Sequence, residues 1–247
     1  MEGLQHRILA EGRSQAEVAR LARLMGYLAD LPAPSDPFGL LPRWGELHAR
    51  FLVALEGDDP ERLEEAFAYL YEHLHGTEAP YSSAERARLS ATGGYWNHAG
   101  GLSPILKAGD HLRHDSISAD FGAGNGLQGL LLQFLYPHRR TVQIEISSRA
   151  VEHGQLLQAW LGIEPERVEW RVMDVCEVSP EGLDFIYLYR PVRPQGQGRE
   201  FYQRFAKTLA GQPREVVIFS IADCLREFLP ERFEVFYSDG QLTCFRG

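Results

Sequence analysis

One short segment constrains this chain more than any other: residues 117–127, with the sequence Ile-Ser-Ala-Asp-Phe-Gly-Ala-Gly-Asn-Gly-Leu. An apolar run ends at Asp120, three alternating glycines follow, and a second apolar run extends to Tyr136. This pattern predicts a buried strand that turns tightly into a helix. Glycines allow positive φ angles and let a ligand approach the backbone, and a helix start presents unpaired N–H groups to a carboxylate or phosphate. The segment therefore predicts a site for a nucleotide-like cofactor.

Two cofactor patterns compete for this segment. Gly124, Gly126 and Gly129 fit the dinucleotide pattern G-x-G-x-x-G, and Glu145 lies at about the right distance to bind a ribose. The second pattern is Asp-x-Gly-x-Gly-x-Gly, which residues 120–126 fill completely. Through this second pattern, residues 100–247 resemble a class I S-adenosylmethionine-dependent methyltransferase.

The end of the chain separates the two patterns. Residues 233–245 form two alternating apolar and polar runs joined at Asp239-Gly240, which is a strong signal for a β-hairpin. The resemblance implies such an antiparallel C-terminal hairpin in a methyltransferase sheet, whereas a dinucleotide-binding domain lacks it. It also implies an α/β fold with a doubly wound, seven-stranded, mostly parallel sheet.

The resemblance further implies the cofactor S-adenosylmethionine, with S-adenosylhomocysteine as its product. Glu145, at the end of the second strand, is expected to accept hydrogen bonds from both ribose hydroxyls, and Asp174, after the third strand, to meet the adenine amino group. The full set of residues expected to bind the cofactor is Asp120, Gly122, Ala123, Gly124, Asn125, Gly126, Glu145, Ile146, Asp174 and Val175.

Periodicity divides the chain into a helical part and an alternating part. Apolar residues at helical spacing, with proline and glycine breaks, predict helices over residues 16–31, 41–55 and 60–74, and a hydroxyl-and-acid cap predicts a short helix from Ser82. Beyond Asp115 we expect strands near 116–121, 141–146, 167–172, 183–189, 214–220, 232–237 and 241–246. Helices are expected near 126–136, 148–162, 198–210 and 222–228. This pattern predicts an N-terminal helical cap (1–92), a connector or lid (93–114) and a cofactor-binding domain (115–247). The alternative for the helices of 1–92 is a packing extension without substrate contact.

The segment after the fourth strand normally faces the methyl group in this family. Here it is Tyr189-Arg190-Pro191, which departs from the Asn or Asp followed by two prolines that amine- and amide-methylating relatives often have. The departure disfavours methylation of an amide or nucleobase nitrogen. Metal-dependent O-methylation is disfavoured as well, because its family supplies a carboxylate ligand here. Tyr189 either orients the acceptor or shields the cofactor, or is simply the last inward residue of its strand.

A glycine-rich connector, residues 92–104, contains two further catalytic candidates. Tyr95 and His98 lie among four glycines, and aromatic residues on such a loop suggest a lid over the ligand. His98 is the best-placed histidine for a general base. For each of these residues an ordinary structural role remains the alternative interpretation.

Composition narrows the partners. A net charge of −9 argues against broad binding to nucleic acid or anionic membranes. No apolar run approaches the roughly 20 residues of a membrane span, the first residues do not read as a signal peptide, and the three cysteines fit neither a metal site nor a disulfide framework. We therefore expect a cytoplasmic protein without a metal. Its oligomeric state is not indicated.

These observations favour transfer of a methyl group to a small-molecule or peptide side-chain acceptor. The alternative is a non-catalytic relative that binds S-adenosylmethionine or S-adenosylhomocysteine as a sensor. A third possibility is an NAD-dependent oxidoreductase, which Asp120 and the final hairpin both disfavour.

Overall fold

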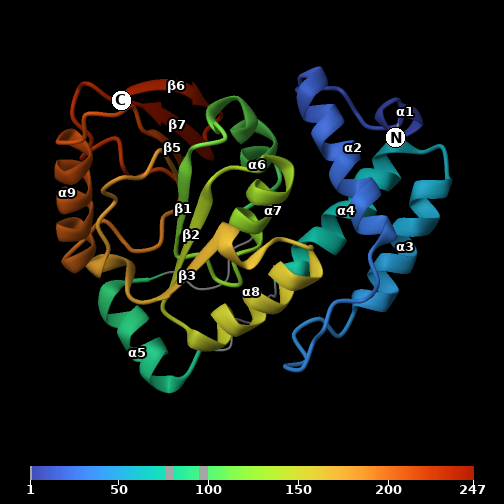
Figure 1. Ribbon diagram of the computed structural model, residues 1–247, viewed down its shortest axis with the longest axis horizontal. Helices are drawn as coiled ribbons and strands as arrows, with labels where there is room; N and C mark the ends of the chain where they lie inside the picture. Colours follow the sequence, from blue (N-terminus) through green and yellow to red (C-terminus); the bar gives the residue numbers. More distant parts are fainter. Residues whose placement is uncertain (1, 76–80, 95–99) are drawn as a thin grey trace.

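A computed structural model describes residues 2–75, 81–94 and 100–247. Its centre is a seven-stranded sheet with the order β3-β2-β1-β4-β5-β7-β6 (Figure 1). The strands are β1 (Ile117–Phe121), β2 (Arg140–Glu145), β3 (Val168–Val172), β4 (Phe185–Tyr189), β5 (Val217–Ile221), β6 (Glu234–Ser238) and β7 (Leu242–Arg246). Neighbouring strands from β3 to β5 pair in parallel, and β7 runs antiparallel to both β5 and β6. The predicted mostly parallel sheet with a C-terminal antiparallel hairpin is confirmed.

Helices connect the strands and fill the N-terminal part. Three of them follow β1, β2 and β4, close to their predicted positions: α7 (Leu127–Leu135), α8 (Ser148–Trp160) and α9 (Gln197–Ala210). The N-terminal helices are α1 (Glu2–Gln5), α2 (Gln15–Asp30), α3 (Trp44–Glu56), α4 (Pro60–Leu74) and α5 (Ser83–Thr92). Short helices complete the set: α6 (Ser103–Lys107), η1 (Ala108–His111), η2 (Pro165–Arg167) and η3 (Val175–Glu177).

The helix expected near 222–228 is absent, so this prediction was wrong. The segment has one turn, closed by a hydrogen bond from the Phe228 N–H to the Leu225 carbonyl at 2.8 Å. The Asp223 carboxylate accepts from the Ser220 hydroxyl at 2.9 Å and from the Leu225 N–H at 2.8 Å. An aspartate bonded to the backbone two residues on forms an Asx turn, which competes with helix formation.

The two faces of the sheet are covered differently. Figure 1 shows α9 on one side and α6, α7 and α8 on the other, with α1 to α4 beyond them. The smaller core cluster lies on the α9 side and contains Phe201, Phe205, Ile186 and Ile218. The chain between β3 and β4 contributes only η3 to that side, so a single long helix covers it among the described residues.

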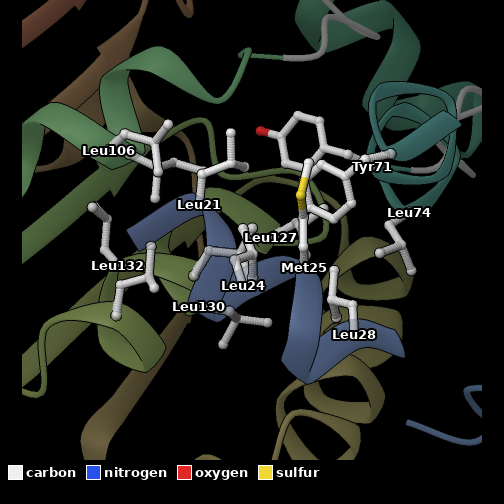
Figure 2. Packing of buried hydrophobic residues seen from close by; sticks show 14 of the residues in the cluster. Leu21, Leu24, Met25, Leu28, Tyr71, Leu74, Leu106, Leu127, Leu130 and Leu132 are labelled. Carbon is white, nitrogen blue, oxygen red and sulfur yellow. The ribbon is translucent and has the colours of Figure 1, made fainter. Parts of the chain in front are cut away.

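The larger core cluster joins the N-terminal helices to the sheet domain. It contains leucines of α2, α4, α6 and α7 together with Phe185 and Phe219 of the sheet. Figure 2 shows Leu21, Leu24 and Met25 of α2 beside Leu127 and Leu130 of α7. The Tyr27 and Phe134 rings stack with centroids 4.3 Å apart. Burial of apolar surface is the main stabilising contribution in folding, so α2 and α7 stabilise each other.

Candidate functional site

The turn between β1 and α7 is held against the neighbouring strand β2. Its three glycines, Gly122, Gly124 and Gly126, have φ angles of +84°, +58° and +71°, which glycine adopts without a steric penalty. The N–H groups of Gly122 and Ala123 donate to the Ile144 carbonyl at 3.0 and 2.9 Å. The predicted unit of strand, tight turn and helix is therefore present.

The three glycines differ in their surroundings. A Cβ on Gly126 would lie 2.4 Å from the Trp170 ring, and one on Gly122 would lie 3.0 Å from the Pro191 side chain. Close packing thus explains these two glycines. A Cβ on Gly124 would meet no atom of the described residues within 4 Å. No described residue covers the backbone at Gly124, so a ligand can approach it there.

Glu145, the last residue of β2, turns its carboxylate toward this turn. It accepts the N–H of Gly124 at 2.8 Å and the N–H of Ser147 at 2.9 Å. The side chain is almost fully buried. Burial raises the pKa of Glu145, and the two N–H donors act in the opposite direction. A carboxylate has about four acceptor positions, so Glu145 can accept further hydrogen bonds from a ligand.

Asp120, near the end of β1, is buried. Burial first, and then the charge of Glu145, raises the pKa of Asp120 to about 8. Its charge in turn contributes to raising the pKa of two buried tyrosines, Tyr71 of α4 and Tyr187 of β4, although burial is the main cause in both. A carboxyl group in this setting favours a cationic ligand group beside it.

Asn125 connects the glycine turn to the N-terminal helices. Its side-chain amide donates to the Leu74 carbonyl at the end of α4, at 2.7 Å, and its side-chain oxygen accepts the Leu127 N–H at 3.2 Å. The end of α4 is thereby fixed against the turn and the start of α7.

Sequence reasoning missed Gln128, which extends this connection. Its amide donates to the Tyr71 hydroxyl at 2.7 Å and to the Gly101 carbonyl at 3.0 Å. The Tyr71 hydroxyl also donates to Gly101, at 3.1 Å. A buried amide in the first turn of a leucine-rich helix was the available signal, because such a group needs a partner.

Asp174 follows β3 at the edge of the sheet, as predicted, but its carboxylate already has two partners. One oxygen accepts the Cys176 N–H at 2.8 Å, and the other accepts the Arg88 Nε–H at 3.0 Å. Arg88 also forms an ion pair with Glu177. Arg88 belongs to α5, a helix of the N-terminal region, and no pattern in the sequence indicated that it would lie beside Asp174.

The remaining candidates lie around the same edge. Ile146 follows β2 and is partly buried, Val175 begins η3 and is buried, and Tyr189 ends β4 and is partly buried against the larger core cluster. Tyr95 and His98 lie outside the described residues, so their roles as lid and base stay predictions.

In the ranges 2–75, 81–94 and 100–247, no group of three or more His, Cys, Asp or Glu residues is arranged to hold a metal ion. No helix of the described part is long and apolar enough to cross a membrane.

Comparisons with known proteins find likenesses of structure only. No protein-family model and no curated protein sequence matches the chain. An RNA methyltransferase from Salinibacter ruber, crystallised with S-adenosyl-L-homocysteine, is 19% identical over 62% of this chain and 92% of its own, with a TM-score of 0.47. A ribosomal-protein methylase from Lactobacillus delbrueckii subsp. bulgaricus is 14% identical over 62% of this chain and 79% of its own, with a TM-score of 0.44.

A third solved structure, TrmN from Thermus thermophilus, is 16% identical over 59% of this chain and 47% of its own, with a TM-score of 0.43. At identities and TM-scores this low, the likenesses add nothing to the order and direction of the strands. The sheet itself, with β7 antiparallel between β5 and β6, has the C-terminal hairpin of the class I methyltransferase fold.

Proposed function

We propose that this chain binds S-adenosylmethionine at the carboxyl ends of β1, β2 and β3 and transfers its methyl group to an acceptor. The observation that supports this most directly is that no described residue fills the space over Gly124, whose φ is +58°. Two buried carboxyl groups belong to the same region: Glu145 accepts the Gly124 N–H, and Asp120 is near enough to Glu145 for their charges to interact. An uncovered backbone near two buried acids suits a ligand with an ammonium group and a ribose.

The described residues fit this cofactor. In the proposed arrangement, the turn at Gly122 to Gly126 and the first N–H groups of α7 bind the methionine carboxylate, and Asp120 lies near the ammonium group. Glu145 accepts from the ribose hydroxyls, Ile146 and Val175 contact the adenine faces, and Asp174 meets the adenine amino group. The bound cofactor supplies an electrophilic methyl group on a sulfonium.

The chain must then align the acceptor and exclude water, since methyl transfer is an in-line displacement. Tyr189, at the end of β4, is proposed to orient the acceptor, with Tyr95 and His98 of the connector. The N-terminal residues 1–92 are proposed as a cap, because α4 contacts the glycine turn through Asn125.

The acceptor itself is not established. The net charge of −9 disfavours extended contact with nucleic acid, yet neighbours named above methylate RNA or a ribosomal protein. We therefore place RNA and protein side chains beside small molecules in an acceptor screen. The non-catalytic alternative predicts tight binding of S-adenosylhomocysteine and no methyl transfer to any acceptor in that screen.

Calorimetry of the purified chain with S-adenosylmethionine, S-adenosylhomocysteine and NAD tests the proposal. The first two ligands should bind and NAD should not. Gly124→Val should weaken binding at least tenfold, or about 1.4 kcal/mol, because a branched side chain would fill the space over Gly124 and oppose the positive φ. Gly12→Val is the matched control, since Gly12 has a φ of +72° with no described atom near its Cβ, and lies in the exposed connection between α1 and α2. Equal affinity in wild type and the folded Gly124→Val variant would refute this placement of the site.

A further inference from the structure

Helix α5 and the residues just before it contact the edge of the sheet. They do so through the acidic residues that are proposed to bind the cofactor. Among its residues only Leu89 is buried, so its apolar contact with the molecule is small. Its polar contacts are more specific. Arg88 donates to Asp174 at 3.0 Å and pairs with Glu177, and Tyr81, just before the helix, interacts with the Glu145 carboxylate.

These two contacts supply the same kinds of hydrogen-bond donor as the adenosine half of the cofactor. A ribose offers O–H donors to Glu145, and Tyr81 offers an O–H donor to the same carboxylate. An adenine amino group offers an N–H donor to Asp174, and Arg88 offers an N–H donor there. One stretch of eight residues, 81–88, therefore supplies an O–H donor to Glu145 and an N–H donor to Asp174.

A ligand and residues 81–88 would share the acceptor positions that remain free on the two carboxylates. Glu145 already accepts from Gly124 and Ser147 and is almost fully buried. The Asp174 side chain is 8% exposed and already accepts from Cys176. Burial first, and then the Glu145 carboxylate, raises the pKa of Tyr81.

Displacement of this stretch requires little disruption elsewhere. The Arg88 side chain is 49% exposed, and ion pairs with so much solvent contact are weak. The far end of α5 has its own attachment, because the Arg193 N–H donates to the Gly93 carbonyl at 3.1 Å. Release of Tyr81 and Arg88 therefore leaves the end of α5 at Gly93 in place.

We propose that residues 81–88 are a built-in competitor of the adenosine group, which must leave Glu145 and Asp174 before the cofactor binds. This inference rests on the proposed function. According to this inference, the N-terminal region lowers the affinity for the cofactor. The affinity for adenosine should be lowered, and the affinity for methionine should not.

Calorimetry with S-adenosylhomocysteine, adenosine and methionine separates these effects. Arg88→Ala should bind S-adenosylhomocysteine and adenosine about two- to fivefold tighter, the gain expected when an exposed ion pair no longer competes. Tyr81→Phe should shift both affinities in the same direction, and methionine binding should not change in either variant. Arg43→Ala is the matched control, because Arg43 is an exposed partner of Glu46 on α3, away from α5. Unchanged or weaker adenosine binding in Arg88→Ala would overturn the inference.

Limited trypsin digestion of the wild type gives a second test that needs no variant. Trypsin cleaves after Arg86 and Arg88, and displacement of α5 predicts faster cleavage there when S-adenosylhomocysteine is bound. Slower cleavage would mean that α5 closes over the ligand, and would overturn the inference.

If the wild type binds neither S-adenosylmethionine nor S-adenosylhomocysteine, the proposed function fails and the inference fails with it. Binding by the wild type without a gain in the variants defeats the inference alone.

Discussion

At the scale of single residues, the site places two carboxyl groups close together in a buried position, where their negative charges repel each other. Asp120 is buried beside Glu145, and its pKa is about 8 instead of the ordinary 3.8. The folded state therefore holds one more proton than the unfolded state between these pH values. Stability from this group is complete below about pH 4 and is lost as the pH rises toward 8, by about 1.4 kcal/mol per pH unit at most.

Asp120→Asn should remove this dependence. The free energy of unfolding of the variant, measured with urea from pH 5 to pH 8, should fall less with rising pH than that of the wild type. Asp115→Asn changes an exposed carboxylate instead and serves as the control. Parallel curves for wild type and Asp120→Asn would contradict the assignment of a raised pKa to this residue.

At the scale of elements, the contact between α4 and the glycine turn depends on Asn125. Asn125→Ala should leave the Leu74 carbonyl and the Leu127 N–H without their side-chain partner, at a cost of about 1–3 kcal/mol. Asn125→Asp retains the acceptor for Leu127, but it replaces the donor to Leu74 with a carboxylate oxygen that repels the Leu74 carbonyl. Hydrogen exchange of the last turn of α4 should therefore accelerate in both variants, whereas the start of α7 should be affected by Ala alone. Unchanged exchange at the end of α4 would show that Asn125 does not fix it.

The elements also show what sequence can and cannot predict here. Strands, α7 to α9 and the C-terminal hairpin were predictable because apolar periodicity and turn residues are local signals. The prediction of a helix at 222–228 was wrong because the Asp223 carboxylate accepts a hydrogen bond from the Leu225 N–H. This bond is a local signal that competes with helix formation. The pairing of Arg88 with Asp174 was unpredictable for a different reason, since 86 positions separate the two residues and only the tertiary fold brings them together.

At the scale of the whole molecule, the shared core predicts a single unfolding transition. Leu24 of α2 is fully buried in the cluster that includes α7 and the sheet, so Leu24→Ala should cost about 2–5 kcal/mol. Because α2 and the sheet stabilise each other, two methods should give the same unfolding midpoint for each protein, wild type or variant. One is tryptophan fluorescence, to which Trp44 and Trp160 contribute, with ring centroids 5.2 Å apart. The other is far-UV circular dichroism. An earlier transition confined to the N-terminal helices would show that they fold separately.

The packing of α2 on α7 has a consequence for biosynthesis. The apolar face of α2, with Leu21, Leu24, Met25 and Leu28, leaves the ribosome about 100 residues before Leu127 and Leu130, which cover it in the finished protein. At about 5–20 residues per second, that face waits roughly 5–20 seconds for its partners. The nascent chain therefore exposes a leucine-rich stripe during translation, and its yield in cells should depend on translation speed and on chaperones that bind such stripes.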